Sequence, residues 1–232
     1  MYRLYSAPNT YAMSAQAILE ELGESYEVIT VTLFSQTPDP GFLAASPHGR
    51  VPALVDEHGT VCETGAIALY LAERHPEAGL AIPPGDPRRA RFLQWLFYLS
   101  STLQPDVILQ FHPEFYCADP RDQRRLKATS LGRLANVLAI LDGALARGPY
   151  FFAEQMTVCD LCLALQAIWP EIYPRTLDDY PNLRRSVETV VRRPAVAKVI
   201  ARHREERARQ GRVRVPATGV DDGELTPGAR HP

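Results

Sequence analysis

Cysteine is scarce in this chain of 232 residues, which contains four: Cys62, Cys117, Cys159 and Cys162. Four scattered cysteines are too few for the disulfide framework that holds small secreted domains together. Residues 159–162 spell C-D-L-C, but this pair lies where a helix is expected to begin, and no second ligand pair stands at zinc spacing. We therefore expect neither a redox pair nor a metal site.

Long apolar runs and an excess of one charge are also missing. No run approaches the ~20 residues of a membrane-spanning helix, and the N-terminal stretch lacks the continuous apolar segment of a signal peptide. The net charge is −2 and the isoelectric point is near 6.3, which gives no reason to expect a nucleic-acid partner. These absences predict a cytoplasmic protein that binds neither membrane nor nucleic acid.

Hydrophobic residues make up 46% of the chain, enough for one large or two small packed domains. Residues 2–5 read as a strand, and the apolar spacing of residues 13–22 predicts a helix that stops at Gly23. Residues 26–33 read as a second strand, and residues 34–43 as a loop. A strand, a helix and a strand in this order predict a parallel crossover.

The stretch 46–64, SPHGRVPALVDEHGTVCET, carries the most specific signals. Pro52 should open a strand, since proline cannot donate to a sheet ladder. If the Val51–Pro52 bond is cis, as in only ~5% of X-Pro bonds, the Val51 backbone turns outward and can pair with an extended peptide. After a reversal at residues 58–59, Glu63 and Thr64 begin a helix, whose N-terminus attracts anions. A small peptide with an acidic end would suit both features, although a plain hairpin and helix cap would show the same residues.

Beyond residue 76 the pattern becomes helical. Residues 77–87 concentrate proline and glycine and read as a linker. Apolar spacing predicts helices over 91–103, 126–145, 180–191 and 195–203, and Pro105 should kink or end the first of them. A further helix should start at Thr157, with Asp160 completing a capping box. The Arg-rich run after residue 201 could bind an acidic partner, but a solvated helix end is favoured.

The motifs G-R-V-P-A-L and E-T-G-A-I, at this spacing, resemble the glutathione-binding half of the soluble, bacterial-like glutathione S-transferases, and the domain order matches over about residues 1–202. The resemblance implies an α/β thioredoxin-like domain over 1–76, a linker over 77–87, an all-α domain over 88–208 and a flexible tail over 209–232. Glutathione is the implied co-substrate, with no metal. Val51 and Pro52 would hold its cysteinyl backbone, Glu63 and Thr64 its γ-glutamyl end. His48 and Arg50 are the nearest cations to its glycyl carboxylate.

The family places the group that activates the thiol in the loop after the first strand. Lowering a thiol pKa by ~2 units requires ~2.7 kcal/mol, and one hydrogen bond to the charged form supplies ~1.5–3 kcal/mol. We favour the hydroxyl of Thr10, which could also cap the helix, then Tyr11, then Ser14, while Asn9 orients the thiol or forms the turn. A surface aromatic and a first-turn helix residue are the structural alternatives for Tyr11 and Ser14.

The resemblance predicts a cytoplasmic, homodimeric glutathione transferase with a role in detoxification, acting on a small hydrophobic electrophile. Alternatives are a glutathione-dependent reductase or isomerase on the same site, and a non-catalytic glutathione-binding scaffold. The cysteine of a common bacterial class falls at Tyr11, so a cysteine-based disulfide reductase would lack its nucleophile. Candidates for the electrophile pocket are Tyr98, Leu103, Phe111, His112, Phe115 and Tyr116.

Overall fold

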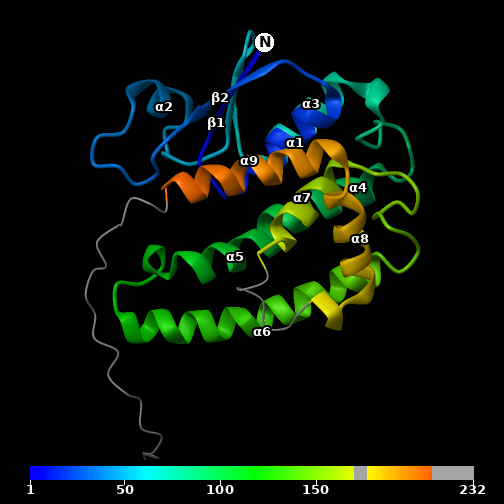
Figure 1. The fold of residues 1–232 in the computed structure, drawn as a ribbon. Coiled ribbons are helices and arrows are strands. Elements are labelled where there is room, and N and C mark those ends of the chain that lie inside the picture. Colours follow the sequence, from blue (N-terminus) through cyan, green and yellow to red (C-terminus); the bar gives the residue numbers. More distant parts are fainter. Residues whose placement is uncertain (170–176, 211–232) are drawn as a thin grey trace, which may run out of the picture.

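A computed structural model describes residues 1–169 and 177–210 of the chain (Figure 1). The N-terminal part contains β1 (Tyr2–Ser6), α1 (Ala12–Leu22), β2 (Tyr26–Thr30), α2 (Pro40–Ala45), β3 (Ala53–Asp56), β4 (Gly59–Cys62) and α3 (Thr64–Arg74). The strands form one sheet in the order β2-β1-β3-β4, with β1 parallel to β2 and antiparallel to β3. The predicted thioredoxin-like order is confirmed.

The ends of the first elements have local causes. Gly23 adopts a left-handed conformation, φ 69°, and ends α1 as the sequence predicts. The helix α2 was expected to be loop. It forms because the Asp39 carboxylate accepts the N–H of Phe42 at 2.8 Å and Pro40 occupies the first turn, where a missing N–H costs nothing.

The rest of the described chain is helical, as predicted. After η1 (Pro76–Ala78) come α4 (Arg89–Tyr98), η2 (Leu99–Leu103), α5 (Gln104–Phe111), η3 (Pro113–Phe115), α6 (Pro120–Ala144), α7 (Val158–Ala167), η5 (Leu177–Asp179), α8 (Pro181–Val191) and α9 (Pro194–Gln210). In Figure 1 these helices lie together on one side of the molecule, with the sheet on the other.

Three element bounds differ from expectation. Pro105 does not end its helix, because the π-helical turn η2 precedes it and the chain continues into α5. The helix α6 starts earlier than predicted, since Asp119 caps it and Pro120 opens it. The helix α9 continues to Gln210, so the expected tail does not begin at residue 209; the rest of that tail, 211–232, lies outside the described residues.

The capping box that opens α7 is confirmed and buried. The Asp160 carboxylate accepts three hydrogen bonds. Thr157 donates its backbone N–H at 2.7 Å and its side-chain hydroxyl at 3.1 Å, and Phe151 donates its backbone N–H at 2.9 Å. The same apolar core contains residues of both halves, among them Ile67 from α3 and Leu161 from α7. The two halves are therefore packed as one body.

Candidate functional site

Three segments meet at one end of the sheet because of its register. Tyr5 of β1 pairs with Ala53 of β3, and Ala53 pairs with Cys62 of β4. The loop that follows β1, the residues that precede β3 and the residues that follow β4 therefore emerge side by side. The register brings Asn9 and Thr10 to the same edge as Val51–Pro52 and Glu63–Thr64.

The Val51–Pro52 peptide bond is cis in the structure. Pro52 is buried and stands immediately before β3, whose pairing with β1 begins at Ala53. Val51 is half-buried and lies outside that ladder, so pairing of β3 with β1 does not use its N–H and C=O. An extended peptide can therefore align against this backbone.

The start of α3 offers a second kind of recognition. Glu63 is exposed and has φ 70°, and Thr64, the first helical residue, is buried. The first intrahelical bond is donated by Ile67 to the Glu63 carbonyl at 2.9 Å, which leaves the N–H groups of the first turn free of helical partners. These N–H groups suit a carboxylate, and the exposed Glu63 suits an ammonium group, as in a free amino-acid end.

The loop between β1 and α1 departs from expectation at Thr10. Thr10 does not cap α1, whose N-cap residue is Tyr11. Its hydroxyl points back along the turn and donates to the Ala7 carbonyl at 2.8 Å. Asn9, in a left-handed conformation with φ 55°, forms this turn. Asn9 and Thr10 are both half-buried at the sheet edge.

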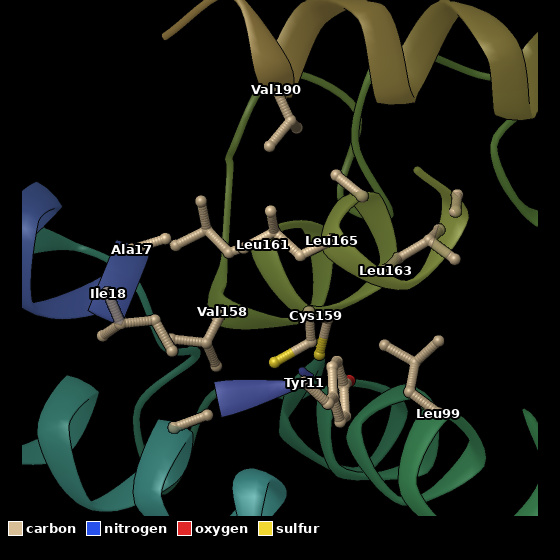
Figure 2. Close-up of a cluster of buried hydrophobic side chains, with 14 of the residues drawn as sticks. Tyr11, Ala17, Ile18, Leu99, Val158, Cys159, Leu161, Leu163, Leu165 and Val190 are labelled. Carbon is tan, nitrogen blue, oxygen red and sulfur yellow. The ribbon is translucent and has the colours of Figure 1, made fainter. Parts of the chain in front are cut away.

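Tyr11 and Ser14 point into the core instead of toward the sheet edge. Tyr11 is not a surface aromatic: it is buried among side chains of α7 and Leu99 (Figure 2). Burial raises the pKa of the Tyr11 hydroxyl well above 10, and the neighbouring Cys162 adds to the shift. Ser14 is also buried, and its hydroxyl lies close to Tyr11 and Cys162.

The C-x-x-C pair belongs to the same interior. Cys159 and Cys162 lie in the first turns of α7 and are buried. Burial raises the pKa of both thiols, to about 12 for Cys162. Buried thiols that stay protonated at neutral pH are poor nucleophiles. In the described ranges no group of three or more His, Cys, Asp or Glu side chains could hold a metal ion.

The two cations near Pro52 have different surroundings. His48 is exposed, whereas the Arg50 guanidinium lies over the ring of Phe115 at 4.3 Å and near that of Phe34 at 5.4 Å. His112 stacks on Phe115 with 4.8 Å between ring centroids. This aromatic clasp of Phe34, Arg50, His112 and Phe115 joins the sheet domain to the helical domain.

The residues expected to line an electrophile pocket include side chains packed in the interior and side chains exposed at the surface. Leu103 is a core residue with no exposed surface, because the π-helical turn faces it inward, and Tyr98 packs edge-on against Trp95. Phe111, Phe115 and Tyr116 are 42%, 38% and 53% exposed.

Trp169 belongs with these aromatic residues and was not anticipated from the sequence. It packs edge-on against Phe111, with 5.9 Å between ring centroids, and its indole N–H donates to Asn9 Oδ1 at 3.3 Å. No local pattern could have found it, since it lies 160 residues from Asn9. Aromatic surface therefore reaches the loop that contains Asn9 and Thr10.

Comparison with known proteins gives matches over both halves of the chain. The glutathione S-transferase N-terminal domain model matches residues 1–73, and the C-terminal domain model matches residues 105–194. No helix in the described ranges is both long and apolar enough to cross a membrane.

Individual relatives cover most of the chain. The glutathione S-transferase-like protein gedE of Aspergillus terreus is 30% identical over 79% of this chain and 87% of its own length. The disulfide-bond oxidoreductase YfcG of Escherichia coli is 29% identical over 86% and 94%. A sphingomonad glutathione S-transferase, solved in complex with glutathione, superposes with a TM-score of 0.77 at 28% identity, over 87% of this chain and 98% of that one. On these matches, the fold and the domain order, the chain belongs to the glutathione S-transferase family.

Proposed function

We propose that the protein binds glutathione at the sheet edge and transfers it, as thiolate, to a small hydrophobic electrophile. The observation that carries this proposal is the convergence of the Asn9–Thr10 loop, Val51–Pro52 and Glu63–Thr64 at one end of the sheet. In this arrangement Val51 pairs with the cysteinyl backbone, while Glu63, Thr64 and the first turn of α3 hold the γ-glutamyl end. His48 and Arg50 are the proposed partners of the glycyl carboxylate.

The thiol is proposed to lie against Asn9 and Thr10. Thr10 donates its hydroxyl hydrogen to the Ala7 carbonyl, so it must exchange this bond for one to sulfur. A neutral hydrogen bond contributes ~0.5–1.5 kcal/mol and one to a charged group ~1.5–3 kcal/mol, so the exchange favours the thiolate. We do not assign this role to Tyr11 or Ser14, because both hydroxyls are enclosed by the core.

The second substrate is proposed to enter between the domains, along Phe111, Phe115, Tyr116 and Trp169. Three of these rings are exposed, and Trp169 touches the loop where the sulfur would lie. An apolar, preferably aromatic, electrophile would therefore meet the thiolate while its ring packs on aromatic surface.

Glutathione-dependent reduction on the same site is a second candidate. The similarity to an oxidoreductase supports it. The buried thiols of Cys159 and Cys162 supply no nucleophile for it, so glutathione itself would have to attack the disulfide. Release of a mixed disulfide instead of a stable thioether would identify this reaction.

We further propose a homodimeric, cytoplasmic enzyme of detoxification. The four cysteines are free in the structure, as expected in a reducing compartment. Phe97 on α4 is 63% exposed, and a large apolar side chain in that position suits a contact with a second copy.

The test combines calorimetric binding of glutathione with the ultraviolet absorbance of its thiolate across pH. Wild-type protein should bind glutathione and lower its thiol pKa, and Glu63→Ala should abolish or strongly weaken binding. Thr10→Ala should leave binding nearly intact but raise the bound thiol pKa by about one to two units, while the control Thr10→Ser keeps the hydroxyl and the low pKa. Binding with an unshifted pKa would favour a non-catalytic scaffold, and no binding would refute the proposal.

A further inference from the structure

The last described helix, α9, lies along α1, the helix that follows the proposed thiol loop (Figure 1). Two ion pairs fix it there. Arg193, just before α9, contacts both carboxylate oxygens of Glu21 at 2.7 and 2.6 Å, and Lys198 contacts Glu20 at 2.8 Å. After Lys198 the buried residues of α9 are Val199, Ile200 and His203, and His203 lies over the start of α1.

His203 is 2% exposed, and both of its ring nitrogens have partners. The backbone N–H of Asn9 lies 3.0 Å from Nδ1, and Gln16 Oε1 lies 2.7 Å from Nε2. An amide N–H can only donate, so Nδ1 must be an unprotonated acceptor. The proton of the neutral ring is therefore on Nε2, which donates to Gln16.

Asn9 is held at two points by the helical half of the chain. Its N–H is bound by His203, and its Oδ1 accepts the indole N–H of Trp169 at 3.3 Å. Because an indole N–H can only donate, the side-chain oxygen must face Trp169 and the Nδ2 group must face away from it. Within residues 1–169 and 177–210 that Nδ2 group has no hydrogen-bond partner.

We propose that His203 is a positioning residue for glutathione activation: through Nδ1 it holds the Asn9 backbone so that Asn9 Nδ2 donates to the glutathione sulfur. The inference rests on the proposed function and deepens it. His203 lies 194 positions from Asn9 in the sequence. The inference is that this residue of α9 controls the geometry of the loop that contains Asn9 and Thr10.

The physical reason lies in the backbone of Asn9. Asn9 has φ 55°, a conformation that asparagine adopts more readily than most residues but less readily than extended or helical backbone, so contacts with its surroundings help to hold it. Without the Nδ1 acceptor the Asn9 N–H loses its partner beneath α9, and the turn can relax toward an ordinary conformation. Asn9 Nδ2 would then no longer face the sulfur.

Two isosteric variants separate the two hydrogen bonds of His203. In His203→Asn the side-chain oxygen can replace Nδ1 and accept the Asn9 N–H, while the bond to Gln16 is lost. In His203→Gln the longer amide can replace Nε2 and keep the bond to Gln16, while the bond to Asn9 is lost. His58→Gln, an exposed histidine in the β3–β4 turn, serves as the matched control.

We expect His203→Gln to raise the thiol pKa of bound glutathione by about one unit and to lower kcat about tenfold, the effect of one hydrogen bond. The dissociation constant of glutathione should stay within about twofold, because Val51, Glu63 and Thr64 are unchanged. His203→Asn should keep kcat and the thiol pKa near the wild-type values, because it retains the acceptor for the Asn9 N–H. His58→Gln should change neither quantity. Thermal unfolding of each variant reports any loss of folded protein.

The inference is overturned if His203→Gln retains the wild-type thiol pKa and kcat, or if the two variants lose activity equally and in step with stability, since His203 would then only join α9 to α1. If His203→Gln does not fold, Trp169→Phe removes the second anchor of Asn9, and the thiol pKa must rise there for the inference to hold. If wild-type protein binds glutathione without a lowered thiol pKa, the proposed function is refuted. The inference is then refuted as well, because there is no activated thiol for His203 to support.

Discussion

Residues other than glycine with positive φ gather around the proposed site. Of the four in the described ranges, Asn9, Phe34 and Glu63 border it, and Ala153 does not. The side chains of Phe34 and Glu63 disfavour this conformation, whereas asparagine tolerates it better. Asn9 is held by His203 and Trp169, Phe34 by the aromatic clasp, and Glu63 by the start of α3. Such strain persists where other contacts over-determine the backbone, which is typical of binding sites.

The pH dependence of stability follows from His203. Burial lowers the pKa of this imidazole below 6.5, so the unfolded chain takes up a proton there before the folded chain does. The folded state is therefore favoured by this residue above pH 6.5 and loses that advantage as the pH falls below it. Arg202 and Glu206 on α9 act on the ring in opposite directions, while Gln16 on α1 is neutral and the nearby Glu20 is paired with Lys198.

Denaturant unfolding of wild-type protein and His203→Gln across pH 5 to 8 measures this linkage, because other titrating groups cancel in the difference. The stability difference in favour of wild type should be constant near neutral pH and shrink below about pH 6.5. A difference that grows on acidification would show that the folded state stabilises the imidazolium.

Residues close together in sequence were predictable at the site, and distant ones were not. Val51, Pro52, Glu63 and Thr64 lie within one short stretch, so a local pattern sufficed to single them out. The hydroxyl of Thr10 was expected to cap α1 but bonds to Ala7, because the left-handed turn at Asn9 redirects it. Trp169 and His203 reach Asn9 only through tertiary packing, which no spacing in the sequence encodes.

At the scale of elements, α7 depends on its capping box. Asp160→Ala removes the acceptor of two buried N–H groups and one hydroxyl, and each unsatisfied buried donor costs ~1–3 kcal/mol. We expect the free energy of unfolding to fall by about 3 kcal/mol, measured by urea denaturation. Asp122→Ala, at an exposed first-turn position of α6, should change it by no more than about 0.5 kcal/mol. Equal losses in both variants would refute the role given to Asp160.

The elements themselves were largely predictable because their signals are local. Gly23, Thr157 and Asp160 mark helix ends where the structure has them. The missed helix α2 and the early start of α6 also follow local signals, the caps at Asp39 and Asp119, which apolar spacing does not report. The helix through Pro105 survives because a π-helical turn accommodates it, and Gly65 of α3 passes so close to this turn that an added Cβ would lie 2.6 Å from Ser100 Oγ. That close approach, which fixes the start of α3 at the site, is not visible in the sequence.

At the scale of the whole molecule, the proposed homodimer predicts a specific weakness. Phe97→Glu places a charge on α4, where Phe97 is 63% exposed, and should shift the protein from dimer to monomer in sedimentation velocity. Ile140→Glu introduces the same charge at another exposed apolar position, on α6, and should leave the dimer intact. A wild-type protein that sediments as a monomer would contradict the dimer. If only Ile140→Glu dissociated the dimer, the dimer contact would have to be assigned to α6 instead of α4.

The hydrogen bond between Asn9 and His203 also sets an order of events during synthesis. Its partners are separated by 194 positions, and at ~5–20 residues per second a ribosome needs about 10–40 s to add that much chain. The strands can pair once they have emerged, but the loop of Asn9 and Thr10 gains its hydrogen bond to His203 only after α9, the last described helix, has been synthesised. In the nascent chain, the hydrogen bond that holds the Asn9 backbone therefore forms only after both halves of the shared core have been synthesised.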